Sequence, residues 1–174
     1  MKTYIALLRG INVSGQKKIL MVDLRALFES IGFKEVRTYI QSGNVVFLAE
    51  EASGLADAIS TAIFKKYGWE VPVLIRTAAE IVSVLSNCPF SEEKKVKSYF
   101  TLFQEIPAEE NIQEVADLNF PGEEFQITPT CLYYFCATGY GRVKMSNNLI
   151  ERKLKVRATT RNYRTLLKLV ELGA

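Results

Sequence analysis

The spacing of apolar residues in the first 76 positions changes repeatedly between that of strands and that of helices. Apolar residues at 20–31 and 55–67 recur every three or four positions, which is typical of amphipathic helices. The second and third strand-like segments meet at Gly43, a residue suited to a tight turn. The segments with strand character are 3–10, 35–40, 44–49 and 71–76. The resulting order, β-α-β-β-α-β, predicts a ferredoxin-like half.

The same order recurs more faintly after a connecting helix, which a capping box from Thr77 to Glu80 opens. Ser146 is placed to cap a later helix and Thr160 to cap a terminal one. The strand-like segments of this part are 97–103, 123–127, 131–137 and 155–158. We therefore predict an α+β fold of two tandem ferredoxin-like halves, with an added helix between them and a C-terminal helix. The expected parts are residues 1–76, a connecting helix and loop at 77–95, and residues 96–174.

Histidine is absent from the 174 residues, which removes every mechanism that needs an imidazole as base, nucleophile partner or metal ligand. The three cysteines, Cys88, Cys131 and Cys136, have no metal-ligand spacing, and their odd number suits a reducing compartment. Cys131 and Cys136 lie five apart on an extended segment, so they face opposite sides of a sheet and cannot pair. We expect Cys88 to pack in the interior. We expect neither a metal nor a cofactor.

The composition, 48% apolar and 24% charged, is that of a soluble globular domain able to bury a sizeable core. No segment approaches the roughly 20 apolar residues of a membrane span. The apolar start is short and already carries Arg9, unlike a secretory signal. We therefore expect a cytoplasmic protein with no membrane partner.

Charge is distributed unevenly along the chain. Residues 77–141 hold three Lys/Arg against ten Asp/Glu, whereas residues 142–174 hold nine against two. The basic segment 142–168 could bind nucleic-acid phosphates, or it could be solvated or paired with the acidic middle of the chain. The predicted strand 44–49 has one aromatic residue, so the stacking platform of an RNA-recognition motif is missing.

The loop from Gly10 to Lys17 follows a strand and precedes a helix, as a phosphate-binding loop does. Gln16 stands where such a loop needs lysine, and no Ser or Thr follows to hold magnesium, which argues against a nucleotide loop. Backbone N–H groups at the two glycines, together with Arg9, Asn12 and Lys17, could still hold an anion. Alternatively, Asn12 only hydrogen-bonds its own backbone.

Three further polar clusters lie at turns and helix starts. Gln41, Ser42 and Asn44 surround the Gly43 turn, although turn chemistry alone explains the glycine and the asparagine. Residues 139–146 and 159–162 precede predicted helices, whose N-termini attract anions. A basic residue at such a position opposes the helix dipole, so Arg161 is favourable there only if something negative binds, either a ligand or an acidic side chain from 105–124.

Four stretches of the chain carry a resemblance to a known family: 4–13, 37–47, 144–148 and 158–165. They resemble the bacterial domain-of-unknown-function family 1697, with Ser14 and Tyr163 as small departures from the family pattern. The resemblance implies two ferredoxin-like lobes and no particular activity. The motif residues that it implies are Arg9, Gly10, Asn12, Gln41, Ser42, Gly43, Asn44, Thr160, Arg161 and Asn162.

The leading hypothesis is a cytoplasmic protein that binds a small anionic or phosphorylated ligand through these motifs. Arg9 and Arg161 would supply charge. Nucleic-acid binding through 142–168 is the second hypothesis, and an enzyme without histidine is the third, disfavoured because no nucleophile–base pair is recognisable. The sequence leaves the oligomeric state open. The candidate ligand-binding residues are Arg9, Asn12, Gln41, Ser42, Asn44, Lys144, Thr160, Arg161 and Asn162.

Overall fold

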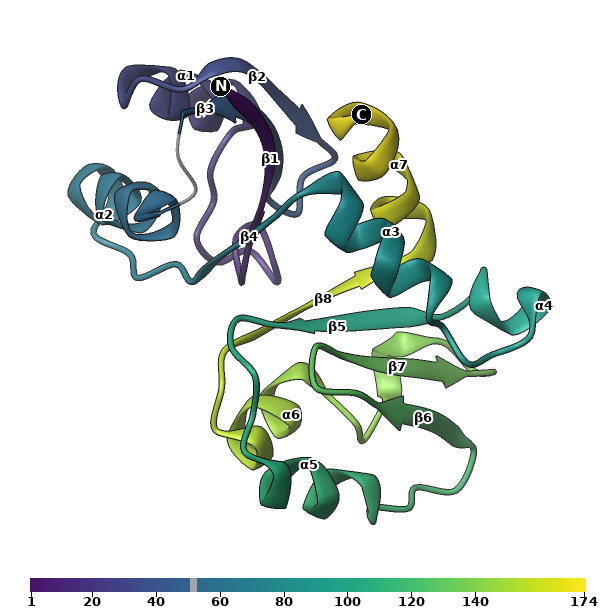
Figure 1. Cartoon of the computed structure of the whole chain (residues 1–174). Coiled ribbons are helices and arrows are strands. Elements are labelled where there is room, and N and C mark those ends of the chain that lie inside the picture. Colours follow the sequence, from purple (N-terminus) through teal and green to yellow (C-terminus); the bar gives the residue numbers. More distant parts are fainter. Residues whose placement is uncertain (51–52) are drawn as a thin grey trace. The chain divides into compact units, whose positions relative to one another are not determined.

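The computed structural model describes residues 1–50 and 53–174, which divide into two compact units (Figure 1). Unit 1 comprises Met1–Ile81 with Lys168–Ala174, and unit 2 comprises Val82–Leu167. The described residues form two four-stranded antiparallel sheets and seven α-helices, which confirms a mixed α+β fold. None of the helices in these ranges is long and apolar enough to cross a membrane.

The sheet of unit 1 has the strand order β2-β3-β1-β4, with every neighbouring pair antiparallel. Each element lies within a few residues of the position that apolar spacing predicts. Helix α3 begins in this unit, after a capping box in which the Glu80 carboxylate accepts the Thr77 N–H at 2.7 Å, as expected. Serine is a favoured N-cap, so the sequence predicts Ser53 as the cap of the helix that follows it, but Gly54 occupies the N-cap of α2. The elements are β1 (Lys2–Leu8), α1 (Met21–Ser30), β2 (Lys34–Tyr39), β3 (Asn44–Ala49), α2 (Leu55–Tyr67), β4 (Val73–Arg76) and α3 (Ala78–Ser86).

The core of unit 1 lies between one face of this sheet and the helices α1 and α2. Alternate residues of a strand point to the same face, so Tyr4, Ala6 and Leu8 of β1 enter this core together. Phe28 of α1 packs edge-on against Phe47 of β3, with ring centroids 5.4 Å apart. Both rings are fully buried. Burial of this face positions the ends of β1 and β3, where the polar motifs begin.

The sheet of unit 2 has the order β6-β7-β5-β8, again antiparallel throughout. Counted in chain order, its four strands are arranged as the four of unit 1 are. Helices α5 and α6 contribute Val115, Ile150 and Leu154 to its core, against Leu132 and Tyr134 of the sheet. The elements are α4 (Glu92–Lys95), β5 (Tyr99–Phe103), α5 (Glu109–Ala116), β6 (Glu123–Ile127), β7 (Cys131–Cys136), a 3₁₀ turn (Tyr140–Arg142), α6 (Asn147–Leu154), β8 (Ala158–Asn162) and α7 (Tyr163–Gly173).

The last strand differs from the prediction. It was expected at 155–158 with Thr160 as a helix cap, but β8 spans Ala158–Asn162 and Thr160 lies inside it, opposite Thr101 of β5. Asn162 caps α7 instead, because its Oδ1 accepts the N–H of Thr165 at 2.8 Å. Pairing along β5 outweighs the local preference of threonine for a helix cap. Ser146 does cap α6, as predicted, by accepting the N–H of Leu149.

Candidate functional site

The side chain of Asn12 joins the two polar motifs of unit 1. Its Nδ2 donates to the carbonyl of Ile19 at 2.9 Å and to that of Gln41 at 2.8 Å. Its Oδ1 accepts the N–H of Ile19 at 2.8 Å. The loop after β1 and the turn between β2 and β3 therefore form one constellation, although 29 residues separate Asn12 from Gln41.

The turn itself is held by the fully buried Asn44, whose Nδ2 donates to the carbonyl of Tyr39 and to Ser42 Oγ at 3.1 and 2.9 Å. The carbonyl of Gly43 accepts the N–H of Leu8 at 2.8 Å. A Cβ at Gly43 would lie 2.8 Å from the Leu8 Cβ, and its φ is +78°. Close approach and backbone angle both require glycine at this position.

The backbone of this constellation is strained. Six residues other than glycine have positive φ angles among the described positions, and four of the six lie in this loop and turn. Ile40, with φ of 48°, is the least expected because its branched Cβ is crowded in the left-handed region. Such conformations cost about 1–3 kcal/mol each and cluster at functional sites. The other three are Asn12, Ser14 and Lys17.

A hollow of about 350 Å³ opens beside Asn12, and we call it the loop hollow. Lys18 is exposed on its wall, and Leu20 adds an apolar surface that is 66% exposed. Lys17 is directed elsewhere, since its Nζ donates to the carbonyl of Glu70 at 2.6 Å. The lining residues are Asn12, Gly15, Lys18, Ile19, Leu20 and Gln41, none of them acidic.

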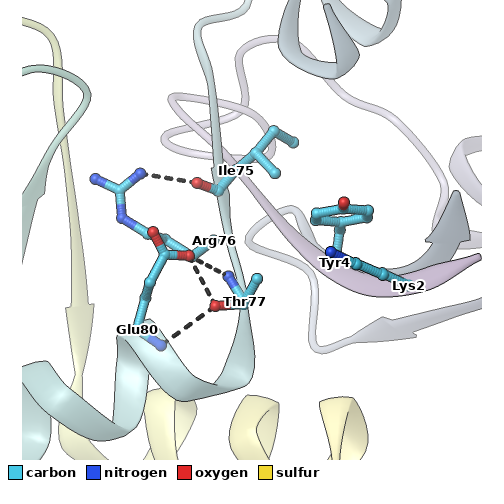
Figure 2. A pocket seen from close by; sticks show the side chains of 6 residues that line it. All are labelled: Lys2, Tyr4, Ile75, Arg76, Thr77 and Glu80. Atoms are coloured by element: carbon cyan, nitrogen blue, oxygen red, sulfur yellow. Dashed lines mark hydrogen bonds between the residues drawn. The ribbon is translucent and has the colours of Figure 1, made fainter. Parts of the chain in front are cut away.

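A second hollow of about 400 Å³, the edge hollow, lies where β4 stops pairing with β1 (Figure 2). Strand β4 covers β1 only from Ile5 to Leu8 before the chain turns into α3, so Lys2 and Tyr4 face this opening. Arg76 donates to the carbonyl of Ile75 at 2.8 Å. The carboxylate of Glu80 is engaged in the capping box. The residues that line it are Lys2, Tyr4, Ile75, Arg76, Thr77 and Glu80.

Sequence reasoning missed the charged residues of both hollows. Lys2 and Arg76 are single charges near strand ends, and only the register of β1 and β4 brings them together. Lys18 directly follows Lys17 in the loop that the sequence singles out, so this basic pair is the one sequence feature that points to Lys18 as a site residue.

The predicted site residue Arg9 lies half-buried after β1, where its backbone N–H donates to the carbonyl of Pro72 at 3.0 Å.

Thr160 belongs to a chain of hydrogen bonds inside unit 2. Its hydroxyl donates to Asn147 Oδ1 at 2.9 Å and lies 2.8 Å from the hydroxyl of Thr101. Arg161, half-buried, donates through Nη1 to the carbonyl of Thr160 at 3.0 Å. Burial lowers the pKa of Arg161 to about 10, so the guanidinium remains charged at neutral pH. Because Arg161 lies in β8, the argument from a helix N-terminus no longer applies to it.

The segment at Lys144 already holds a negative group from the chain itself. The carboxylate of Glu123 accepts the backbone N–H groups of Lys144 and Met145 at 2.7 and 3.0 Å. The backbone N–H groups that precede α6, which the sequence suggests as an anion site, are therefore bound by an acidic side chain of the chain itself. The side chain of Lys144 is exposed.

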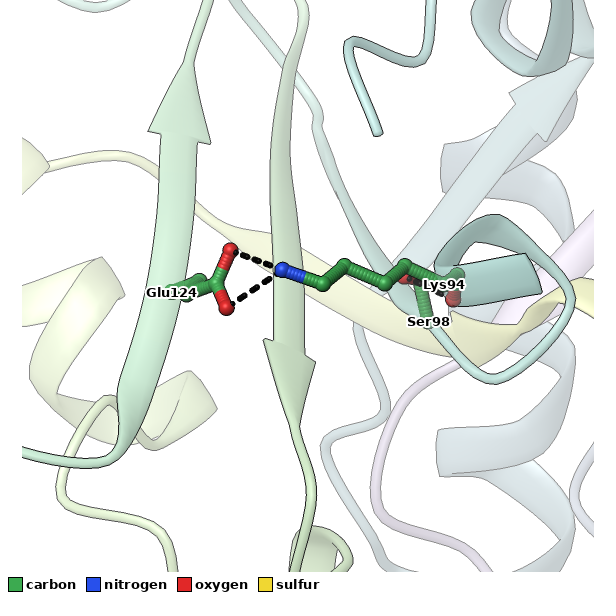
Figure 3. Close-up of polar contacts among 3 residues, drawn as sticks. All are labelled: Lys94, Ser98 and Glu124. Atoms are coloured by element: carbon green, nitrogen blue, oxygen red, sulfur yellow. Dashed lines mark hydrogen bonds and ion pairs between the residues drawn. The ribbon is translucent and has the colours of Figure 1, made fainter. Parts of the chain in front are cut away.

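Glu124, the next residue along β6, points to the other face of the sheet and pairs with Lys94 (Figure 3). Lys94 Nζ lies 2.7 and 2.8 Å from the two carboxylate oxygens, and the carbonyl of Lys94 accepts the hydroxyl of Ser98. The ammonium also lies 5.3 Å from the ring centre of Phe135.

The nine candidate residues are divided between the two units. Within unit 1, hydrogen bonds connect Asn12 to the Gln41 backbone and Asn44 to Ser42. Within unit 2, Thr160 and Arg161 are neighbours on β8, and Asn162 caps the next helix. Among the residues described, no group of three Asp, Glu or Cys side chains is placed to hold a metal ion.

Comparison with curated proteins gives no match. Among solved structures, the conserved bacterial protein SP0830 from Streptococcus pneumoniae is similar, with a TM-score of 0.75 and 22% sequence identity. The similarity covers 99% of this chain and 98% of that one, and at this identity it establishes the fold alone. The family model described as "Protein of unknown function (DUF1697)" matches residues 1–133, which is most of the sequence. The chain therefore belongs to the DUF1697 family.

Proposed function

We propose that this protein binds a small anionic ligand in the loop hollow of unit 1. The observation that carries the proposal is the tie between Asn12 and Gln41, which sets an exposed lysine beside a hollow with no acidic wall. The volume of about 350 Å³ lies at the lower end of the range for small-molecule sites, about 300–1,000 Å³.

The lining indicates the chemistry of the ligand. Lys18 supplies a positive charge, and the side-chain amide of Gln41 can donate or accept a hydrogen bond. Ile19 and Leu20 supply an apolar wall. We therefore expect a ligand with one phosphate or carboxylate group and an apolar or aromatic part. Both side-chain N–H groups of Asn12 donate within the loop and turn, so its part is to position the site rather than to donate to an anionic ligand.

The test is a thermal-shift titration of the full chain with inorganic phosphate, ribose 5-phosphate and AMP. A ligand at about 100 times its Kd adds about 2.7 kcal/mol, which raises Tm by about 5–11 °C for a chain of this size. We expect Lys18→Met to remove the shift and Lys65→Met, an exposed lysine on α2, to keep it. A shift that Lys2→Met removes and Lys18→Met retains places the ligand in the edge hollow and contradicts the proposal.

Nucleic-acid binding through 142–168 stays a prediction, and one observation favours it. Most basic side chains of this segment are exposed, whereas Lys153 is already paired with Glu114 of α5. Binding through six to ten phosphate contacts would weaken by about 10³–10⁵ between 50 and 200 mM salt. Oligonucleotide titration at these two salt concentrations tests it. The exposed residues are Arg142, Lys144, Arg152, Lys155, Arg157 and Arg164.

We also propose that residues 1–76 and 96–174 are two ferredoxin-like halves joined by 77–95. The support is that each half has the order β-α-β-β-α-β, with its first strand between its third and its fourth. The predicted cytoplasmic location belongs to the same hypothesis, and a fluorescent fusion expressed in a bacterial host tests it.

A further inference from the structure

Cys136 ends strand β7 in surroundings that differ from those of the other two cysteines. None of the three is in a disulfide. Cys131 is fully buried, whereas Cys88 and Cys136 are both partly exposed. Cys88 and Cys136 are therefore two partly exposed thiols in one chain whose local chemistry differs.

Hydroxyl groups gather at the Cys136 sulfur. Thr138 Oγ1 lies 3.1 Å from Sγ, within hydrogen-bond distance. Tyr134 precedes Cys136 by two positions on the same strand, so both side chains lie on the same face of the sheet. Tyr134 is only 1% exposed, and its hydroxyl lies near both the Cys136 thiol and the Glu123 carboxylate without a hydrogen bond of normal geometry to any described residue.

A second buried hydroxyl, that of the partly buried Tyr140, continues this cluster. The ring of Tyr140 packs edge-on against Tyr134, with centroids 6.0 Å apart, and its hydroxyl is likewise without a described partner. Leaving a buried hydroxyl unsatisfied costs about 1–3 kcal/mol, so two together call for an explanation. An anionic sulfur beside Tyr134 accepts a hydrogen bond that a neutral thiol accepts only weakly.

One nearby charge opposes a thiolate. Glu123 is directly opposite Cys136 in the β6–β7 register, and its carboxylate acts to raise the thiol pKa. That carboxylate accepts the N–H groups of Lys144 and Met145, so part of its charge is already compensated. The hydrogen bond from Thr138 has the largest effect and lowers the pKa of Cys136, while burial raises that of Cys88.

We propose that Cys136 is a thiol-modification site that forms mixed disulfides with low-molecular-weight disulfides. The Cys136 thiolate attacks one sulfur of the small disulfide, and the original S–S bond breaks as the new one forms. One half of the reagent remains bound to Cys136, and the other leaves as a thiolate that takes a proton from water. No other oxidant is required, because the reagent disulfide is reduced as the thiol is oxidised.

The test uses the intact chain and glutathione disulfide, with peptide mass spectrometry to follow each cysteine separately. Between two thiols, one unit of pKa changes the thiolate fraction about tenfold and the intrinsic nucleophilicity about threefold in the opposite sense. We expect Cys136 to react at least about threefold faster than Cys88 at pH 7. Equal rates at the two cysteines, or a faster Cys88, overturn the proposal.

Two variants test whether the neighbouring hydroxyl groups, rather than solvent exposure alone, make the Cys136 thiol reactive. We expect Thr138→Val to move the midpoint of the pH–rate profile of Cys136 upward, and Tyr134→Phe to do so while keeping the ring in the core. Thr130→Val, at an exposed position before β7, is the control that should leave the profile unchanged. If the profile of Cys136 is the same in all three variants, the hydroxyl groups do not stabilise the thiolate and the proposal fails.

Discussion

At the scale of single residues, Asn12 illustrates how one polar side chain can hold a loop against a distant turn. Its three hydrogen bonds and its left-handed φ of 54° are both accommodated by asparagine, which tolerates that conformation better than most residues. Sequence spacing identifies Asn12 and Gly43 as turn residues. The contact between the loop that holds Asn12 and the turn that holds Gly43 depends on the pairing register of β1 and β3, which local sequence does not encode.

We expect Asn12→Ala to destabilise unit 1 by about 2–4 kcal/mol, because it removes three hydrogen bonds and places alanine in a left-handed conformation. Urea unfolding followed by circular dichroism measures the change. Asn87→Ala, an exposed asparagine with one long contact at 3.4 Å, is the control and should stay within about 0.5 kcal/mol. A similar loss in both variants contradicts the anchoring role.

Gly43→Ala is expected to cost about 2–4 kcal/mol, since the new Cβ would lie 2.8 Å from the Leu8 Cβ and the backbone keeps a φ of +78°. Gly122→Ala provides the comparison, because Gly122 has a φ of +83° but open space around it. The difference between the two free energies of unfolding isolates the steric contribution. If the two variants are equally stable, the close approach to Leu8 contributes nothing.

At the scale of elements, strand β8 marks the limit of what could be predicted. Short apolar segments place seven of the eight strands within a few residues, because those strands bury one or both faces. Strand β8, with the sequence Ala-Thr-Thr-Arg-Asn, lacks that pattern, and its threonines and asparagine are also good helix caps. Its extended form comes from pairing with β5 and from the contact between Thr160 and Thr101, which are distant in sequence.

A pair of variants tests which residue begins helix α7. We expect Asn162→Ala to speed amide hydrogen exchange in the first turn of α7 and to cost about 0.5–2 kcal/mol, as the loss of an N-cap does. Thr160→Val should instead loosen β8, where it removes the hydrogen bond to Asn147, and leave the first turn of α7 protected. If the first turn of α7 frays only in the Thr160 variant, Thr160 is the helix cap, as the sequence predicts, and Asn162 is not.

At the scale of the whole molecule, each unit has a hydrophobic cluster of its own, and the two clusters have no residue in common. Phe47 is fully buried in the first cluster and Phe103 is 1% exposed in the second. Truncating either side chain leaves a cavity and costs about 3–5 kcal/mol. Since the lost contacts belong to one cluster, we expect the effect to be confined largely to one unit.

Native-state hydrogen exchange on Phe47→Ala and Phe103→Ala measures this directly, because it reports the opening free energy of each strand separately. Phe47→Ala should lower protection in β1 and β3 while β5 and β7 stay within about 0.5 kcal/mol of the parent chain, and Phe103→Ala should do the reverse. Equal losses in all four strands would mean that the chain unfolds as a single cooperative unit. A ligand in the loop hollow should raise protection in unit 1 first, because ligand binding stabilises the unit that holds it.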